Sequence, residues 1–270
     1  MKNRLLTVLA LLLMLASADA YAQRPRMRAP RPPRRHMEDR SNFFRGIGLE
    51  FGYANSAYRT VDLATDESSS SGMLHGFTAG LSKDFTLLRH ALYFQTGLEY
   101  IYQSNPGNRT VSVEEAGHAL RVVGGREEHH VAVPLRLKYD IHLQDDLGLS
   151  FDAGPTLLMG LSSKYKYMTR FSDDAISSVE YNLYNARVTA SGLSSVFDLE
   201  DWMRTSGMYP KGRIGRADVM LGASVGVHFY HIIELRVGYD YGLMNRYRKD
   251  IAYVYNMRRG QFTLSAGIRF

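Results

Sequence analysis

The most regular pattern of apolar and polar residues lies at the carboxy-terminal end of the chain. From Phe262 to Phe270 an apolar side chain occupies every second position, and polar or small residues, among them Arg269, stand between them. A strand is the element whose side chains point to opposite faces at successive residues. The segment 261–270 therefore predicts a β-strand with one apolar and one polar face.

The same alternation recurs upstream and predicts seven further strands. These predicted strands cover residues 47–54, 73–83, 92–103, 131–140, 149–157, 219–229 and 234–242. The connections between the eight strands are alternately short, at 85–91, 141–146 and 229–232, and long, at 55–72, 104–126, 161–215 and 245–260. Alternating connection lengths and strands of about ten residues are typical of outer-membrane barrels. We therefore predict an all-β fold, an eight-stranded antiparallel transmembrane β-barrel with short periplasmic turns, long extracellular loops and both termini in the periplasm.

A soluble eight-stranded barrel of the lipocalin type is the main alternative, and the composition of the two faces separates them. A soluble barrel buries its apolar residues inside. Here the polar faces are rich in glycine and small residues, as a narrow lumen requires, whereas the apolar faces carry large side chains. Tyrosines near the strand ends are expected to form aromatic girdles in contact with outer-membrane lipid. These tyrosines are Tyr53, Tyr100, Tyr102, Tyr139, Tyr239 and Tyr241.

Charged residues on the predicted inward faces suggest what fills the lumen. The acidic and basic members of this set nearly balance, and unpaired charges in a low-dielectric interior are costly. An eight-stranded barrel has room inside for side chains and little else. We expect a network of ion pairs that closes the pore, with a path for protons or small ions as the alternative. The set is Glu50, Glu99, Arg136, Lys138, Asp152, Glu234, Arg236, Asp240 and Arg269.

The first 42 residues differ from the rest of the chain. Residues 1–22 combine a charged start, a short apolar run and small residues at the end, which predicts a signal peptide cleaved before Gln23 and hence an exported protein. Residues 23–42 form a proline-rich basic tail, expected to be extended in the periplasm. Residues 43–270 are predicted to form the barrel domain. The basic residues of the tail include Arg24, Arg26, Arg28, Arg31, Arg34 and Arg35.

The net positive charge of the chain comes largely from this tail. The chain has 33 basic residues (Lys and Arg) and 27 acidic ones (Asp and Glu). The signal holds two basic and one acidic residue, and the tail holds seven basic and two acidic, which leaves 24 of each sign for the barrel. A neutral domain argues against a nucleic-acid-binding surface. The tail is either a solvated spacer or a contact for anionic lipid headgroups or an acidic periplasmic partner.

Catalytic chemistry is poorly supported. His129 and His130 follow Glu127 and Glu128. Adjacent residues of a strand face opposite ways, so this cluster is only a weak indication of a metal or catalytic site. Neither HExxH, a nucleophile elbow nor a phosphate-binding loop is present. We predict no enzyme activity, no metal site and no cofactor, with an outer-membrane hydrolase as a remote alternative. A short helix is expected at 194–204, inside the longest loop.

Three short segments carry a family resemblance. The stretch His130–Tyr139, with Pro-Leu before Lys-Tyr, together with Gly154–Pro155 and Gly238–Leu243, resembles the small outer-membrane β-barrels widespread in Bacteroidetes and often called PorT-like, of the OmpA/OmpX size class. The resemblance spans residues 43–270. It implies a structural role, or one in assembly or secretion with an envelope or secretion-system partner, because some relatives are implicated in type IX secretion and gliding. A small-solute or ion porin is the alternative.

The last residue adds one more expectation. A terminal aromatic residue such as Phe270, preceded by alternating apolar residues, resembles the signal that bacterial barrel-assembly machinery recognises. That resemblance implies that the machinery is a partner of the chain during biogenesis.

Overall fold

The chain is described as a computed structural model that covers most of the predicted barrel domain. The described residues are 46–70, 72–88, 91–115, 118–144, 147–171, 174–192, 213–230, 232–248 and 252–270. The predicted signal peptide (1–22), the basic tail up to residue 42 and the loop helix at 194–204 lie outside them.

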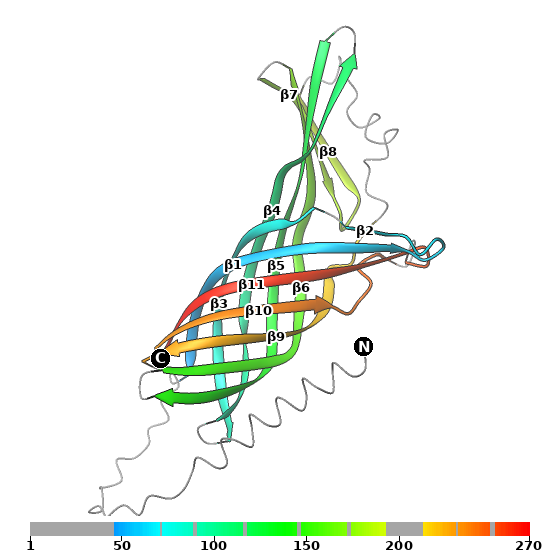
Figure 1. Cartoon of the computed structure of the whole chain (residues 1–270). Coiled ribbons are helices and arrows are strands. Elements are labelled where there is room, and N and C mark those ends of the chain that lie inside the picture. The colour runs from blue at the N-terminus through cyan, green and yellow to red at the C-terminus, as the bar shows by residue number, and fades with distance from the viewer. Residues whose placement is uncertain are drawn as a thin grey trace, which may run out of the picture. The chain divides into compact units, whose positions relative to one another are not determined.

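Eleven strands are present in these residues (Figure 1). They are β1 (Ile47–Asp62), β2 (Ser68–Ser70), β3 (Leu74–Leu88), β4 (Leu92–Glu115), β5 (His118–Gln144), β6 (Leu147–Phe171), β7 (Asp174–Asn182), β8 (Arg187–Gly192), β9 (Ala217–Phe229), β10 (Ile233–Gly242) and β11 (Tyr255–Arg269).

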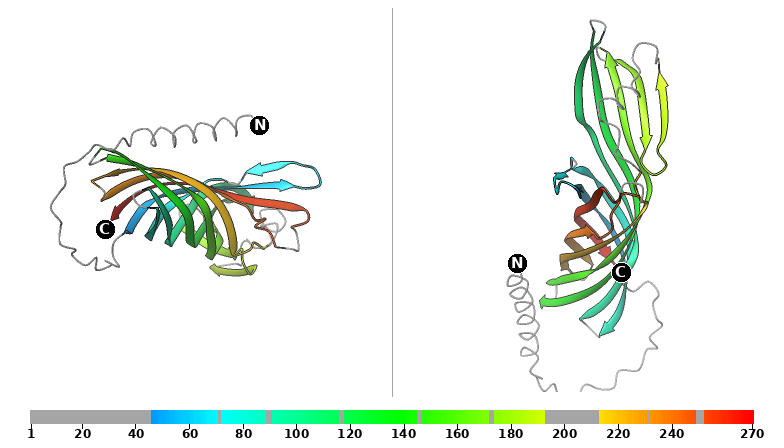
Figure 2. Two further views of the ribbon diagram at one scale, coloured as in Figure 1. Left: turned by 90° about the horizontal axis from the view of Figure 1, so that it is seen from below. Right: turned by 90° about the vertical axis from the view of Figure 1, so that its right-hand side faces the viewer.

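Eight of the strands close into a ring in which every neighbouring pair is antiparallel. The order around the ring is β1, β3, β4, β5, β6, β9, β10 and β11, and β11 pairs back onto β1 from Arg269 opposite Gly48 to Tyr255 opposite Asp62. Figure 2 shows the tilted strands lying side by side around this ring. Closure pairs the backbone of every strand on both sides, which a sheet needs in order to span a bilayer. The predicted eight-stranded antiparallel barrel is confirmed.

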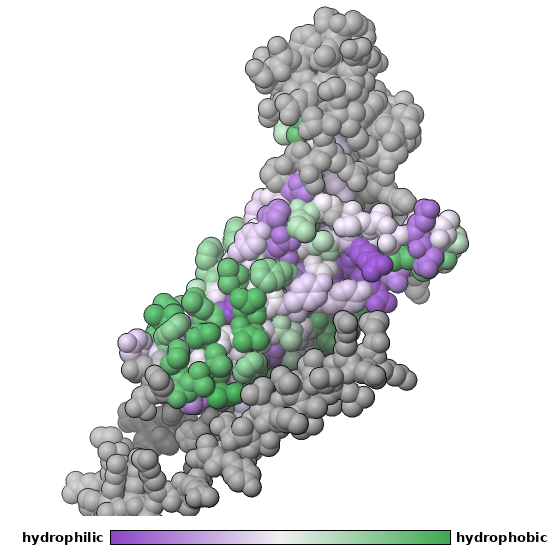
Figure 3. Space-filling view, viewed as in Figure 1, coloured by the Kyte–Doolittle hydropathy of each residue, from purple (hydrophilic) through white to green (hydrophobic). Residues whose placement is uncertain are grey.

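The two faces of the barrel are those of a membrane protein. On β1, Leu49, Phe51 and Tyr53 are exposed, with Phe51 at 63%, whereas Gly52 and Ala54 on the opposite face are buried. Figure 3 shows the apolar residues gathered over the half of the barrel that holds the short turns. The buried residues of the ring are largely polar and charged. This arrangement is the reverse of a lipocalin-type barrel, so the apolar faces are lipid-facing.

The connections differ from the prediction at one end of the barrel. The turns between β3 and β4, β5 and β6, and β9 and β10 are short, as expected. The segment 104–126, predicted as a loop, instead continues β4 and β5 as a long hairpin, and β6 runs on to Phe171 before β7 and β8. The apolar alternation stops where lipid contact stops, because outside the bilayer the outer face of the sheet no longer meets lipid and need not be apolar. The loss of the pattern marked the end of the apolar band, rather than the end of the strands.

An apolar cap lies at the long-loop end of the ring. The connection between β7 and β8 folds onto the barrel, where the Leu183 amide donates to the Ser163 carbonyl at 2.9 Å and the Ile214 amide donates to the Leu183 carbonyl at 3.0 Å. These residues belong to one buried cluster. Its members are Tyr58, Leu74, Tyr181, Leu183, Tyr184, Ile214 and Met257.

The part of the chain that the structure describes holds no helix of the length and hydropathy needed to cross a membrane, a finding that concerns helices alone.

Candidate functional site: the charged lumen

The centre of the lumen is built around Arg136 of β5. Its Nη1 donates to Asp152 of β6 at 2.9 Å, and its Nη2 donates to both carboxylate oxygens of Asp240 of β10, at 2.7 and 2.9 Å. Alternation along β5 turns Arg136 inward because Leu135 and Leu137 take the opposite face. One guanidinium therefore joins three strands across the interior, a geometry that suits its planar fork of donors.

A second layer of pairs lies nearer the short turns. Lys138 Nζ lies 3.4 Å from Glu234 Oε2 and 3.7 Å from Asp84 Oδ2. Arg269 pairs with both of these carboxylates. Arg236 donates to Glu234 at 3.1 Å and lies 3.5 Å from Asp152, so it connects this layer with the central one. It also donates to Glu50 Oε2 at 3.2 Å. The layer joins β1, β3, β5, β10 and β11.

The structure brings eight of the nine predicted lumen charges into these pairs. The ninth, Glu99, lines the adjoining cavity beside Thr78. Two further carboxylates, Asp84 and Asp140, belong to the lumen and were not predicted as lumen charges. Asp84 was missed because the predicted strand ended one residue earlier. The described residues of these two layers therefore include seven acidic and four basic groups.

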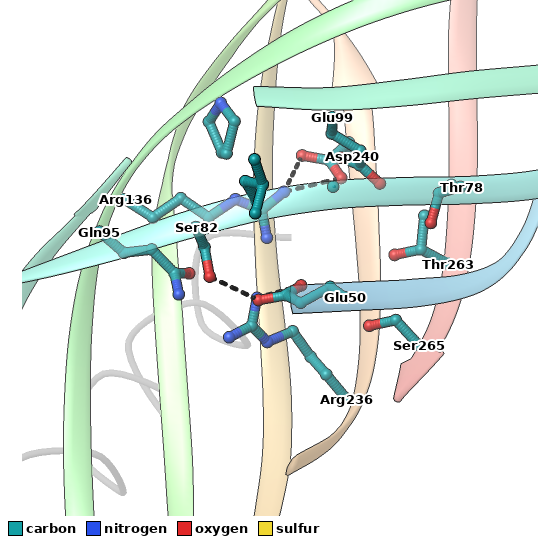
Figure 4. Close-up of a pocket in the computed structure, with 13 residues that line it drawn as sticks. Glu50, Thr78, Ser82, Gln95, Glu99, Arg136, Arg236, Asp240, Thr263 and Ser265 are labelled. Atoms are coloured by element: carbon teal, nitrogen blue, oxygen red, sulfur yellow. Dashed lines mark hydrogen bonds and ion pairs between the residues drawn. The ribbon is translucent and has the colours of Figure 1, made fainter. Parts of the chain in front are cut away.

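A cavity of about 50 Å³ remains within the network, large enough for a few water molecules. Figure 4 shows Arg136 reaching Asp240 on one side of it and Ser82 reaching Glu50 on the other. Most of its lining side chains are polar and come from the inward faces of the ring. Among the described residues, no group of three or more His, Cys, Asp or Glu side chains is arranged to hold a metal ion.

The sequence itself matches one protein family over most of its length. Residues 39–248 match the model described as "Outer membrane protein beta-barrel domain". The chain belongs to this family. The protein is therefore an outer-membrane β-barrel, and the exposed apolar band of its ring lies in that membrane.

Solved structures similar to this outer-membrane barrel are distant from it. They include Ail, the attachment invasion locus protein of Yersinia pestis (13% identity, 84% of this chain and 99% of that one, TM-score 0.36), and the neisserial surface protein A (11%, 83% and 97%, TM-score 0.34). The outer-membrane enzyme PagL is similar at 12% identity, over 80% and 99% of the chains, with a TM-score of 0.37. At these scores the likenesses support no inference about a role. No curated protein matches the chain.

The barrel contains a further charged layer under the cap, which the sequence reading missed. Glu128 of β5 accepts hydrogen bonds from Tyr58 at 2.6 Å and Ser163 at 2.9 Å, and it pairs with Arg126 and Arg259. The predicted strand began at Val131. Extending the alternation of β5 upstream by three residues would have placed Glu128 and His130 on the inward face.

The weak catalytic cue at 127–130 divides between the two faces of β5. His129 and Glu127 face outward, with Nε2 2.9 Å from Oε1, and the His129 Nδ1 lies 2.6 Å from the Tyr100 hydroxyl. Glu128 and His130 face inward, so the four residues do not form one site.

Glu127 lies beyond the apolar band. In the strand register it is opposite Lys164 of β6, three residues past the exposed Leu161. The hydrogen bond from Lys166 and then that from His129 lower the pKa of the Glu127 carboxyl. The same contact with Glu127 raises the pKa of Lys166. In the cap, burial raises the pKa of Tyr184 to about 12. These groups keep their ordinary neutral-pH charge states.

The predicted girdle tyrosines all lie on the outward faces. Tyr53, Tyr239 and Tyr241 are exposed, and Tyr100 and Tyr102 flank Phe77 with ring centroids 6.2 and 5.5 Å away. Tyr139 lies toward the short-turn end, opposite Leu92. Five of the six thus lie toward one end of the band. Their anchoring role stays a prediction, as does the assembly signal at Phe270, whose side chain is 63% exposed.

Proposed function

We propose that this outer-membrane barrel is a non-conducting structural protein, acting in assembly or secretion through the parts it presents outside the bilayer. The observation that carries the proposal is the filled lumen. Arg136, Arg236 and Lys138 join carboxylates of five strands, and the apolar cap packs at the long-loop end. The alternative of a small-solute or ion porin requires a continuous wet path, which these pairs and the cap oppose.

The proposed orientation places the short turns and both termini in the periplasm and the long connections outside the cell. Support comes from the difference between the two ends of the ring, since outer-membrane barrels have short periplasmic turns and longer extracellular loops. In this orientation the predicted basic tail, residues 23–42, would lie in the periplasm. There it could meet anionic headgroups or an acidic partner.

The PorT-like character remains part of the proposal. The segment His130–Tyr139, which carries the resemblance, forms part of β5, the strand that supplies Arg136 and Lys138 to the lumen. The segment therefore has a structural task in this barrel. We further propose that the protein is not an enzyme and binds no cofactor. The predicted lumen charges other than Glu99 form ion pairs with one another or with neighbouring lumen groups, and the outward Glu127–His129 pair lacks a Ser, Thr or Cys nucleophile among its observed contacts.

The surface proposed to meet a partner is the sheet that β4, β5, β6, β7 and β8 form beyond the ring. Its pairings run from Arg109 opposite Gly124 on β4 and β5 to Asn182 opposite Arg187 on β7 and β8. Paired strands give such an extension a defined backbone, and a binding surface built on strands is positioned more precisely than one on a loop. An envelope or secretion-system protein is the proposed partner, in addition to the assembly machinery that inserts the barrel.

Two deletions test this assignment in intact outer membranes. One replaces residues 106–123 with a two-residue turn, which shortens the β4–β5 hairpin and keeps the ring. The other removes residues 23–40. We expect cross-linked partners to be lost with the first deletion while the barrel still folds, as judged by its resistance to detergent unfolding on gels. Partners retained in both deletions would contradict the proposed contacts, and steady single-channel current would contradict the closed lumen.

A further inference from the structure

Three buried arginines surround one tyrosine ring beneath the cap. The guanidinium carbons of Arg126, Arg246 and Arg259 lie 4.1, 5.9 and 5.8 Å from the centroid of the Tyr58 ring. They come from β5, from the connection between β10 and β11, and from β11. The side chains of Arg246 and Arg259 are fully buried, and that of Arg126 is 8% exposed. Guanidinium groups stay charged in proteins, so three positive charges meet in a small enclosed volume.

Two of these arginines have acceptors nearby. Arg126 pairs with Glu128. Arg259 donates to Gln261 at 2.7 Å and to Gln103, and its Nη1 lies 3.1 Å from His130 Nε2. Because a guanidinium can only donate, a hydrogen bond to that ring nitrogen requires it to be an unprotonated acceptor, so His130 contributes no charge to the cluster.

Arg246 is different. None of its three side-chain nitrogens has a hydrogen-bond partner among the described residues. The facing carboxylate is Asp218, whose Oδ2 lies 3.8 Å from Nη1, beyond hydrogen-bond distance. Asp218 in turn lies close to the backbone N–H groups of Val219 and Met244. A buried guanidinium with a carboxylate at 3.8 Å and no hydrogen bond is unfavourable, so the donors of Arg246 are not satisfied.

The unmatched groups around the cluster are mainly donors. They are Arg246 Nε, Nη1 and Nη2, Arg126 Nε, Arg259 Nε and Gln103 Nε2, against the two oxygens of Asp218. The Tyr184 hydroxyl in the cap also has no partner. Three arginines against Glu128 and Asp218 leave one net positive charge. An acceptor with a single negative charge would satisfy both the excess of donors and the excess of charge.

We propose that the arginine cluster under the cap binds one small monovalent inorganic anion of the chloride class, with Arg246 as its main ligand. The proposal goes beyond the structural role, because it assigns a ligand to the mouth of the barrel. Once bound, the anion links Arg246 of the β10–β11 connection with Arg126 of β5 and Arg259 of β11, and so ties that connection to the ring.

Bromide is a suitable probe. The refolded full chain in a nonionic detergent is titrated with potassium bromide against potassium gluconate, at constant ionic strength, and the unfolding midpoint in urea is followed. Gluconate serves as the reference because it is a much bulkier anion than bromide. We expect the midpoint to rise and saturate with bromide, as mass action requires for a ligand of the folded state. A midpoint that does not respond, or that changes without saturating, would overturn the proposal and leave water as the occupant.

Arg246→Leu and Arg248→Leu form a matched pair in the same connection. Both remove one positive charge, but Arg248 is exposed whereas Arg246 is buried. Arg246→Leu is expected to raise the half-saturating bromide concentration roughly tenfold or more, because it removes a charged donor. Arg248→Leu is expected to leave it unchanged. An equal loss in both variants would show general screening and contradict a site at Arg246.

Asp218→Asn tests the same site in the opposite direction, and it does not depend on Arg246→Leu folding. The carboxylate competes with the anion for Arg246, and its removal takes a negative charge from within about 5 Å of the site. The half-saturating bromide concentration is expected to fall about tenfold. A concentration that stays the same or rises would contradict the proposal.

Discussion

Arg136 on β5 donates through one nitrogen to both carboxylate oxygens of Asp240 on β10, at 2.7 and 2.9 Å. The two strands are separated in the ring by β6 and β9, so the contact crosses the lumen rather than following the sheet. The backbone ladder holds each strand only to its neighbours. Side-chain pairs of this kind link strands that are not neighbours in the ring, and they fill the space that a pore would need.

Removing one member of this pair should destabilise the barrel strongly. Arg136→Met leaves Asp152 and Asp240 without their shared donor, and breaking a buried pair costs about 3–5 kcal/mol. The double variant Arg136→Met/Asp240→Leu should recover part of that loss, since it leaves one fewer carboxylate unpaired. Reversible urea unfolding in lipid vesicles measures both. Strictly additive losses would show that the two residues do not interact.

The outward position of the apolar face predicts an effect that depends on depth. Leu98 is 57% exposed within the apolar band of β4, and Leu63 is 52% exposed in the turn after β1. Leu98→Arg should cost about 2–4 kcal/mol, because an arginine is then placed in the bilayer interior. Leu63→Arg should change stability by less than about 0.5 kcal/mol, as a surface substitution does. Equal effects on unfolding in vesicles would argue against a lipid-facing Leu98.

Close packing of β3 against β4 makes Gly76 a sensitive position. A Cβ atom added there would overlap the backbone carbonyl oxygen of Tyr102, and backbone cannot move aside as a flexible side chain can. Gly76→Ala should therefore cost about 1–3 kcal/mol. At Gly215 the nearest atoms are 3.7 and 3.8 Å from such a Cβ, so Gly215→Ala serves as the control. Comparable stability of the two variants would contradict the predicted strand contact.

The Glu127–Lys166 contact predicts a modest pH dependence above the apolar band. The pKa of Glu127 is lowered from about 4.5, so its stabilising effect is present above that pH and is lost as the pH falls through the lowered value. The pKa of Lys166 is raised, so its contribution disappears only at alkaline pH. Both side chains are partly exposed, which limits the effect to about 0.2–1 kcal/mol.

Hydrogen exchange of the β5 and β6 amides beside this contact, compared at pH 6 and pH 3, would measure that loss. Each rate is corrected for the intrinsic effect of pH. Glu127→Gln removes the titrating group, so the corrected protection of these amides should change less between pH 6 and pH 3 in this variant than in the wild type. The same pH response in wild type and variant would assign the effect to other residues.

The sequence was sufficient for the ring and for most of its charged interior. Period-2 alternation located eight strands, because lipid on one side and a packed lumen on the other impose opposite demands on neighbouring residues, as at Phe51 and Gly52. The same rule turned Arg136 and Asp240 inward. Which acid meets which base depended on the stagger of strands such as β5 and β10, and alternation within one strand does not encode it.

The parts beyond the apolar band were predicted less well, for a physical reason. Once β4, β5 and β6 leave the bilayer, neither face must be apolar, so Arg126 and Glu128 carried no periodic signal strong enough to extend the strand. Arg246 lies in a connection and is buried by the cap. Its position depends on the β7–β8 connection folding back over the ring, a long-range contact with no local trace in the sequence.

The most direct test of the closed lumen is single-channel recording from the full mature chain in planar bilayers, with insertion verified separately by protease protection. The ion pairs around Arg136 and the apolar cap predict no stable conductance steps across the physiological voltage range. Reproducible open steps from the properly folded wild-type barrel would contradict a filled lumen and would favour transport.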